Sequence, residues 1–251
     1  MFRHGSLFSG IGGFDLAAEW MGWENVFQVE WDLYCQKVLT KNFPNTKRYG
    51  DIKEFDGTKY RGAIDILSGG FPCQDISVSG QGKGIYGKRS GLWSEYYRII
   101  RQISPKYVVI ENSPNLLKKG FEQILYDLSE SGYDAEWQCL CASDFGHPHE
   151  RERIFIIAYP IIQGRRGILH QLKRSIIKKN KETNSLDSSC SPFLQFEKRF
   201  SEPPVFRVVD GLSKRLDAIN RLGACGNSII PDIAYQIFKA IEEFVLNENK
   251  V

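Results

Sequence analysis

Residues 6–21 read SLFSGIGGFDLAAEWM and contain a short apolar strand end, a glycine-rich loop and an amphipathic helix, in that order. We expect the strand to end at Ser6–Phe8 and the helix to span Gly12–Met21. Glycines between a strand and a helix let backbone N–H groups approach a ligand at the helix N-terminus. A plain tight turn has the same composition, so the loop alone is weak support for a binding site. The candidate ligand contacts in this loop are Phe8, Gly10, Gly12 and Gly13.

Strand-like and helix-like segments alternate along the first 159 residues, a pattern typical of a mostly parallel sheet covered by helices on both faces. Glycine-poor apolar runs predict the strands, and apolar residues at helical spacing predict the helices. The last two strands should form an antiparallel edge. The further strands are expected at 26–29, at a short segment just before Asp51, and at 64–67, 107–110, 136–141 and 154–158. The further helices are expected from Leu33 toward Pro44 and at 92–103, 121–128 and 231–246.

An acid and an aromatic residue follow the second expected strand, as Glu30 and Trp31. A carboxylate there can accept hydrogen bonds from two ribose hydroxyls, and the indole beside it can stack on adenine. Asp51 and Ile52, after the third strand, can hold the adenine amino group and close its other face. Together with the glycine loop, these residues predict an adenosine-containing cofactor.

The composition limits the remaining possibilities. The 251 residues are 42% hydrophobic and contain no apolar run long enough for a membrane span. No signal peptide precedes the first strand, so we expect a cytoplasmic protein. The six cysteines form no Cys-x-x-Cys pair, which argues against structural zinc. The formal net charge is only +3, but residues 160–181 carry seven Lys or Arg and no acid, typical of a solvated face or of phosphate contact.

A second glycine-containing stretch, SGGFPCQDIS at residues 68–77, follows the strand expected at 64–67. A thiol just past a strand end, behind a proline that stiffens its approach, is a plausible nucleophile. Cys73 is therefore the candidate nucleophile. A small buried cysteine is the alternative interpretation.

Two further segments carry polar residues suited to a reaction site. Glu111 follows the fifth strand in VVIENSP (108–114), and a buried carboxyl there would have a raised pKa that favours proton donation. Arg151 and Arg153 alternate in HERER (149–153), so both guanidiniums can reach one cleft. The alternative for Glu111 is a structural hydrogen-bond partner. The alternative for Arg151 and Arg153 is a surface ion-pair ladder with the neighbouring glutamates.

These motifs resemble, in order, those of the DNA (cytosine-5)-methyltransferases: the Pro-Cys loop, the Glu-Asn pair, the double-Arg strand and a Gly-Asn-Ser element at residues 226–228. The resemblance covers about residues 5–159 and 206–246, and His149 stands where the family has Gln. It implies a Rossmann-like S-adenosylmethionine-dependent methyltransferase fold with a small irregular target-recognition lobe. The implied domains are a catalytic and cofactor-binding domain (1–159), a variable region (160–205) and a returning C-terminal segment (206–251).

The resemblance also implies residue roles. S-adenosylmethionine is the cofactor, with Pro72, Asn227 and Ser228 added to its pocket. Cys73 adds to cytosine C6, Glu111 binds N3, and the arginines hold the base or Glu111. The segment VSGQGKGIYGKRSG (78–91) resembles the loop that closes on DNA. The residues expected to contact DNA are Ser77, Lys88, Arg89, Arg165, Arg166, Lys178 and Lys179.

The expected partner is double-stranded DNA. We expect a monomer that does not associate with membranes, and the sequence leaves open whether a cognate restriction endonuclease exists. Two other functions stay open. A tRNA-methylating branch of the family carries Cys-Phe-Thr in its variable region, whereas the cysteine here, Cys190, precedes Ser-Pro. The other open function is that of a catalytically silent cofactor-binding module. The presence of Cys73, Glu111, Arg151 and Arg153 argues against it.

Overall fold

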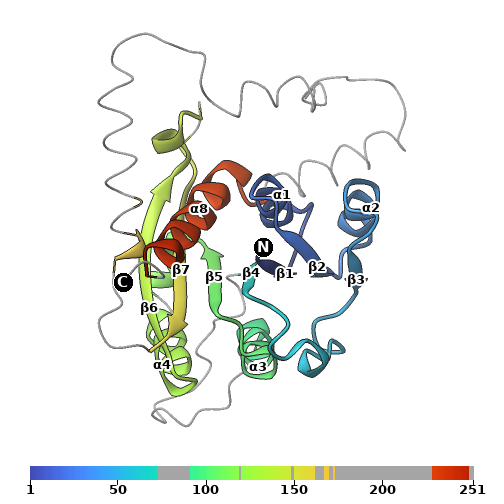
Figure 1. Ribbon diagram of the computed structural model, residues 1–251, viewed down its shortest axis with the longest axis horizontal. Helices are drawn as coiled ribbons and strands as arrows, with labels where there is room; N and C mark the ends of the chain where they lie inside the picture. The colour runs from blue at the N-terminus through green and yellow to red at the C-terminus, as the bar shows by residue number, and fades with distance from the viewer. Residues whose placement is uncertain are drawn as a thin grey trace.

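The computed structural model describes residues 1–72, 91–118, 120–147, 150–161, 167–169, 172 and 228–248. In these residues a seven-stranded sheet has the order β3-β2-β1-β4-β5-β7-β6 (Figure 1). The strands from β3 to β5 are parallel, and β7 and β6 each run antiparallel to their neighbours. The strands are β1 Arg3–Leu7, β2 Glu24–Val29, β3 Lys47–Tyr49, β4 Ile66–Gly70, β5 Tyr107–Asn112, β6 Tyr133–Cys141 and β7 Glu152–Pro160.

The strand order reverses beside β1. The chain passes from β1 outward to β2 and β3, then returns to place β4 on the other side of β1. In an open α/β sheet, this reversal leaves a crevice beyond the carboxyl ends of the two central strands, where ligands bind. The predicted mixed, mostly parallel sheet with helices on both faces is confirmed, including its antiparallel edge.

Helices cover the two faces of the sheet with different partners. α1 and α8 lie against each other on one face, where Phe14 stacks on Phe238 (Figure 1). α3 and α4 pack on the other face, in a second core cluster. The helices are α1 Gly13–Trp20, α2 Leu33–Asn42, α3 Leu92–Ile103, α4 Phe121–Glu130 and α8 Pro231–Glu248.

Local sequence explains where these helices begin and which side they bury. Asp32 caps α2, because its side chain accepts a hydrogen bond from the Cys35 N–H at 2.8 Å. Along α3, aromatic and aliphatic residues recur at helical spacing and are all buried. They are Trp93, Tyr96, Tyr97, Ile99, Ile100 and Ile103.

Among the strand ends that differ from the sequence prediction, those of β4 and β1 have a clear local cause. β4 continues through Gly70, whereas the sequence predicts a loop from Ser68 onward. Gly69 and Gly70 stay in the strand because close neighbours leave no room for a side chain: a Cβ at Gly69 would lie 2.5 Å from the Leu7 carbonyl oxygen. β1 ends at Leu7 instead of Phe8, whose φ of 51° is left-handed and cannot continue a strand.

The predicted variable region, residues 160–205, lies almost entirely outside the described residues. Of it, 160, 161, 167–169 and 172 are described, and Ile168, Leu169 and Leu172 are buried in the core beside α8. In the part of the chain that the structure describes, we find no helix long and apolar enough to cross a bilayer.

Candidate active site

A cavity of about 480 Å³ opens beyond the carboxyl ends of β1, β2 and β4. Its lining joins loops that are far apart in the sequence, as the strand-order reversal requires. Six of the residues predicted from the sequence as cofactor contacts share this cavity: Phe8, Glu30, Trp31, Asp51, Ile52 and Pro72.

Glu30 is held rigidly at the cavity wall. Its Oε2 accepts a hydrogen bond from the Gly10 N–H at 2.7 Å, and its Oε1 accepts one from the Asp32 N–H at 2.8 Å. Burial raises the pKa of this carboxyl, and the backbone hydrogen bonds partly oppose that shift. A carboxylate has about four acceptor positions, so two backbone donors leave capacity for ligand hydroxyls.

Trp31, next along the chain, is 78% exposed although it lines the cavity. A tryptophan normally buries much of its surface, so this open indole offers a flat apolar platform to a ligand. In the same lining, Ile52 is buried, and the Asp51 Oδ1 accepts a hydrogen bond from the Lys53 N–H at 2.9 Å. An acid, an aromatic face and an apolar wall therefore meet around one cavity.

The glycines of the first loop act through packing. Gly10 and Gly12 have φ values of 55° and 92°, which side chains rarely adopt. A Cβ on Gly12 would collide with the Phe43 ring, and one on Gly13 would lie 2.6 Å from the Ile229 carbonyl oxygen. Gly10, Gly12 and Gly13 do not line the cavity, but they set the path of the loop that holds Glu30.

Glu111 is a buried acid on the strand next to β4, which leads to the Pro-Cys loop. It lies within β5 instead of just after it, is 8% exposed, and pairs in register with Gly70 of β4. A Cβ at Gly70 would lie 2.5 Å from the Glu111 Oε2, so glycine is needed beside the carboxyl. Burial raises the pKa of Glu111 to about 7, against the opposing charges of Arg153 and Arg151.

The two arginines of the HERER segment flank the start of β7 and act on different partners. The Arg153 Nε lies 3.0 Å from the Glu111 Oε1, an ion pair across neighbouring strands. The Arg151 Nη2 donates to the Ser228 carbonyl oxygen at 2.9 Å, which joins this segment to the residues before α8. The structure therefore brings Glu111, Arg151, Arg153 and Ser228 together, and Ser228 does not line the 480 Å³ cavity.

A hydrogen bond joins the Glu-Asn pair to the approach of the Pro-Cys loop. The Asn112 Nδ2 donates to the Phe71 carbonyl oxygen at 2.9 Å, and Asn112 is buried. Phe71 and Pro72 are the last described residues before Cys73. The other predicted site residues outside the described part of the chain are Ser77, Lys88, Arg89, Arg165, Arg166, Lys178, Lys179 and Asn227, as is His149 of the HERER segment.

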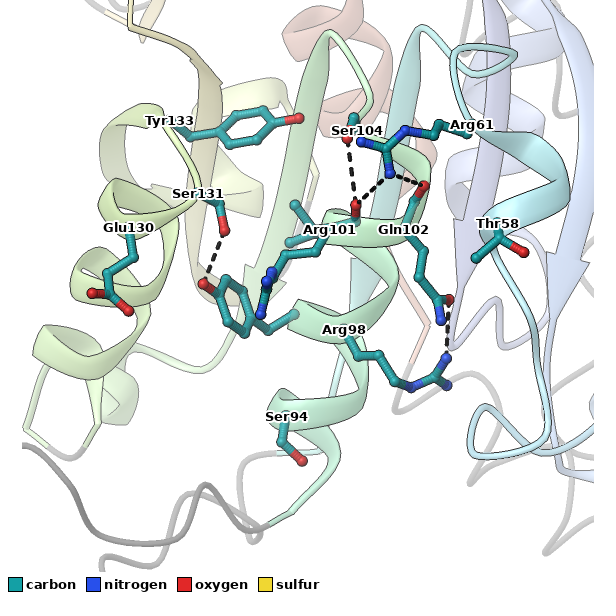
Figure 2. A pocket seen from close by; sticks show the side chains of 12 residues that line it. Thr58, Arg61, Ser94, Arg98, Arg101, Gln102, Ser104, Glu130, Ser131 and Tyr133 are labelled. Carbon is teal, nitrogen blue, oxygen red and sulfur yellow. Dashed lines mark hydrogen bonds between the residues drawn. The ribbon is translucent and has the colours of Figure 1, made fainter.

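One wall of the cavity was missed by the sequence analysis. It is formed by the residue before α3 and the first turn of that helix, namely Gly91, Leu92, Ser94 and Glu95, with Val29, Gly50 and Lys53 completing the lining. Their position, directly after the glycine-rich segment 78–91, is the signal that could have indicated them. A larger hollow of about 740 Å³ lies along α3 and shares Ser94, but contains none of the predicted site residues (Figure 2).

The sheet order and the crevice beside β1 define a Rossmann-like methyltransferase fold. Solved structures with this fold include a DNMT2 variant from Spodoptera frugiperda, at 22% identity and a TM-score of 0.56 over 65% of this chain and 51% of that one. Another is a putative DNA modification methyltransferase encoded within an Escherichia coli prophage, at 26% identity and a TM-score of 0.53, covering 64% and 47%.

The chain belongs to the C-5 cytosine-specific DNA methylase family, whose model matches residues 2–195. Among curated relatives, it is 40% identical over 157 residues to the type II methyltransferase M.HhaI of Haemophilus parahaemolyticus, which covers 61% of this chain and 47% of the relative. It is 37% identical over 163 residues to M.NgoBI of Neisseria gonorrhoeae, covering 63% and 51%. The chain thus spans about half the length of these relatives.

Proposed function

We propose that this protein methylates C5 of cytosine at specific sites in double-stranded DNA, with S-adenosylmethionine as the methyl donor. The observation that carries the proposal is the buried Glu111, paired with Arg153 at 3.0 Å, on the strand next to the one that leads to Cys73. Membership of the cytosine-specific methylase family supports the same reaction.

The cavity fits an adenosine-containing cofactor. About 480 Å³ lies within the roughly 300–1,000 Å³ of small-molecule sites. Glu30 would accept the ribose hydroxyls, Trp31 would stack on adenine, and Asp51 would accept from its amino group. When bound, S-adenosylmethionine supplies an electrophilic methyl group, carried on its sulfonium, for C5.

Cys73 would act as a covalent catalyst because cytosine C5 is a poor nucleophile. Its thiolate forms a bond to C6, which breaks the C5–C6 double bond and makes C5 enamine-like. After C5 gains the methyl group, loss of the C5 proton restores the double bond and breaks the Cys73–C6 bond. The thiolate is thereby regenerated, and the product is 5-methylcytosine.

Glu111 would act as the proton donor to cytosine N3 while Cys73 adds. With a pKa of about 7, this carboxyl keeps its proton in much of the population at neutral pH, which an ordinary glutamate would not. Once the proton has moved to N3, the carboxylate is stabilised by the Arg153 guanidinium already at its side, and it takes the proton back from N3 when Cys73 leaves C6.

DNA recognition would rest on base flipping, because the enzyme cannot reach C6 inside the stacked duplex. Ser77, Lys88 and Arg89 would contact DNA around the flipped base. The basic residues of the variable region, Arg165, Arg166, Lys178 and Lys179, would contact phosphates, which strengthens binding on all sequences and makes it salt-dependent. Because base edges are read by few side chains, a small region can serve a site of about two to five base pairs.

The decisive experiment is tritium transfer from labelled S-adenosylmethionine to mixed-sequence duplex DNA. We expect label at cytosine C5 with the wild-type protein, none with Cys73→Ala, and a loss of about 10²–10⁴-fold with Glu111→Gln, the range for a positioned proton donor. Cys141→Ala removes a half-buried thiol of β6 and is the matched control, with activity near wild type.

Covalent trapping tests the adduct separately. Duplex DNA containing 5-fluorocytosine should form a denaturant-stable complex with wild-type protein and cofactor, because fluorine cannot leave as the C5 proton does, and Cys73→Ala should form none. Transfer of label to tRNA but not to DNA would overturn the substrate proposal. Cofactor binding without transfer to either nucleic acid would favour a silent binding module.

A further inference from the structure

Arg98 of α3 contacts both its own helix and the loop that follows β3. Its Nη2 donates to the Ile52 carbonyl oxygen at 2.8 Å, and its Nη1 donates to the Phe55 carbonyl oxygen at 3.0 Å. The same Nη1 lies 3.0 Å from the Gln102 Oε1, an interaction drawn in Figure 2. One guanidinium therefore holds two carbonyls of a single loop.

The contacts of Arg98 reach both walls of the cofactor cavity. Ile52 belongs to the loop wall, and Glu95, which pairs with the Arg98 Nε at 2.8 Å, belongs to the helix wall. Gln102 extends the contact, because its Oε1 also accepts the Gly57 N–H at 2.9 Å. Arg98 does not itself line the cavity.

Backbone turns alone hold this loop weakly. Between residues 51 and 57 the described backbone hydrogen bonds are Glu54 N–H to the Asp51 carbonyl and Phe55 N–H to the Ile52 carbonyl. Ile52 and Phe55 are nevertheless buried, and polar backbone groups in buried segments need hydrogen-bond partners. From the neighbouring helix, the fork of Arg98 adds a second donor to the Ile52 carbonyl and a donor to the Phe55 carbonyl.

We infer that Arg98 is a positioning residue for the cofactor, which fixes the spacing between the Ile52 wall and the α3 wall of the cavity. This inference rests on the proposed function, because it assigns the cavity to the adenosine part of S-adenosylmethionine. Arg98 acts through the Ile52 and Phe55 carbonyls and through Glu95. Its removal should weaken cofactor binding without slowing the chemical step.

The Glu95 pair alone would not support this role. Partly exposed ion pairs within one helix contribute little to stability. The hydrogen bonds to the two loop carbonyls distinguish Arg98 from a residue that only forms an ion pair within its helix. A lysine at this position could not form both of them. A lysine presents one ammonium on a flexible stem and cannot reproduce a planar fork with fixed donor directions.

Arg101, one turn further along α3, provides the matched control. Its guanidinium carbon lies 5.9 Å from the centre of the Tyr97 ring, and this contact faces away from the cofactor loop. Figure 2 shows Arg101 and Arg98 on the same helix, with Arg98 next to Gln102. Arg101→Met therefore removes the same type of side chain without touching Ile52 or Phe55.

The test compares Arg98→Met, Arg98→Lys and Arg101→Met in the full chain. For Arg98→Met we expect the Kd and KM for S-adenosylmethionine to rise about ten-fold, the order expected for a lost charge-assisted hydrogen bond, while kcat and the KM for DNA stay within about two-fold. The Kd and KM of Arg98→Lys for S-adenosylmethionine should lie between those of the wild type and Arg98→Met. Those of Arg101→Met should match the wild type. A fall in kcat with an unchanged cofactor KM would overturn the inference.

Amide hydrogen exchange gives a readout that needs no cofactor. Residues 52–57 should exchange faster in Arg98→Met than in wild type or Arg101→Met, while β1 and β4 keep their protection. Unchanged exchange in this loop would refute the inference even if the cofactor proved to be a different molecule. Failure of the wild-type protein to bind S-adenosylmethionine would refute the proposed function and leave the exchange result to decide the role of Arg98.

If Arg98→Met does not fold, Gln102→Leu replaces it. That variant removes the acceptor shared by Arg98 and Gly57 and should raise the cofactor KM in the same direction by a smaller factor. Normal cofactor affinity in both Gln102→Leu and Arg98→Lys would contradict the inference.

Discussion

The two faces of the central sheet are built from different chemistry. The face under α3 and α4 is apolar and aromatic, with Phe27, Tyr96 and Ile110 fully buried. The face under α1 and α8 buries a row of polar side chains, because Ser68, Ser6 and Gln28 lie at matched register on three adjacent strands. Glu111 continues this polar face toward α8, since Gly70 beside it also approaches Ile229.

Two ionisable groups complete the polar face away from the reaction site. His4 bridges Asn25 and Ser68 through hydrogen bonds of 2.7 Å each, and Asp15 of α1 accepts one from Ser6 at 2.9 Å. Burial lowers the pKa of His4 to about 4 and raises that of Asp15 to about 7. Both shifts favour the neutral form.

The comparison shows how one sheet combines stability with chemistry. The apolar face contributes stability that does not depend on pH, through close packing. The polar face keeps acids and bases in a medium that penalises charge, which is how burial raises the pKa of Glu111 to about 7. If this division is correct, substitutions on the two faces should differ in their pH dependence.

The largest expected effect is on the apolar face. Phe27→Ala should lower the free energy of unfolding by about 3–5 kcal/mol, because the ring packs against Phe55 and Tyr60 and leaves a cavity when removed. Urea unfolding at pH 5.5 and 7.5 should give the same loss. A loss that varies strongly with pH would break the comparison.

Asp15→Asn should reveal the first pH-dependent contribution of the polar face. The raised pKa means that the folded protein holds a proton that the unfolded chain releases above its ordinary value of 3.8. Wild-type stability relative to Asp15→Asn should therefore fall by ~4 kcal/mol as the pH rises from about 4 to 7. Parallel stability curves for the two proteins over this range would show that Asp15 does not titrate as its burial requires.

His4→Gln should give a slope of opposite sign. The folded pKa of about 4 lies below the ordinary value of 6.5, so between these values the unfolded chain binds a proton that the folded protein does not. Wild-type stability relative to His4→Gln should rise by ~3 kcal/mol from pH 4 to 6.5 and then level off. Chemical denaturation across this range measures the difference, and a gap independent of pH would contradict the expected burial of neutral His4.

Gly69 and Gly70 of β4 face opposite sides of the sheet, so substituting each of them tests one face. Gly69→Ala places a Cβ near the Leu7 carbonyl and Tyr96, so it should cost about 1–3 kcal/mol of stability. Gly70→Ala meets the end of the Glu111 side chain instead of backbone, and should cost less stability but most of the activity. Thermal unfolding and methyl transfer should be measured on both variants, and equal activity in the two would contradict this assignment.

The smallest expected effect is a shift in a pH profile. Protonated Glu111 is present below a pH of about 7 and is lost above it, so wild-type kcat/KM should decline on the alkaline side from about that pH. Because Arg153 lowers the pKa of Glu111, Arg153→Met should move this decline upward by about one pH unit, at reduced activity. A decline that moves to lower pH would contradict the ion pair's effect on Glu111.

Much of the fold and of the cavity beside β1 could be predicted because both follow from local pattern. Strand–loop–helix alternation sets the parallel sheet, and residues directly after parallel strands must meet at one edge. Glu30, Trp31, Asp51 and Ile52 were predicted on this basis, and they share one cavity. Their individual roles, and those of Cys73 and the DNA contacts, stay predictions.

The remaining features depend on contacts between distant segments. The sequence predicts a loop at Gly69 and Gly70, because glycine usually marks a turn, whereas here it allows close approach within a strand. The loop contacts of Arg98 were likewise not predicted. Nothing in the spacing of α3 indicates that this guanidinium reaches Ile52, more than forty residues earlier in the chain.

The hydrogen bond between Arg151 and the Ser228 carbonyl, together with the fit of Ile229 against Gly13, bears on biosynthesis. A ribosome that has made the first 160 residues has produced the strands, the acid and both arginines, but not the segment that holds Arg151. Because closing so long a loop is slow, assembly of the site should be among the last events of folding. A nascent chain would therefore stay inactive until residues 228–248 have emerged and docked.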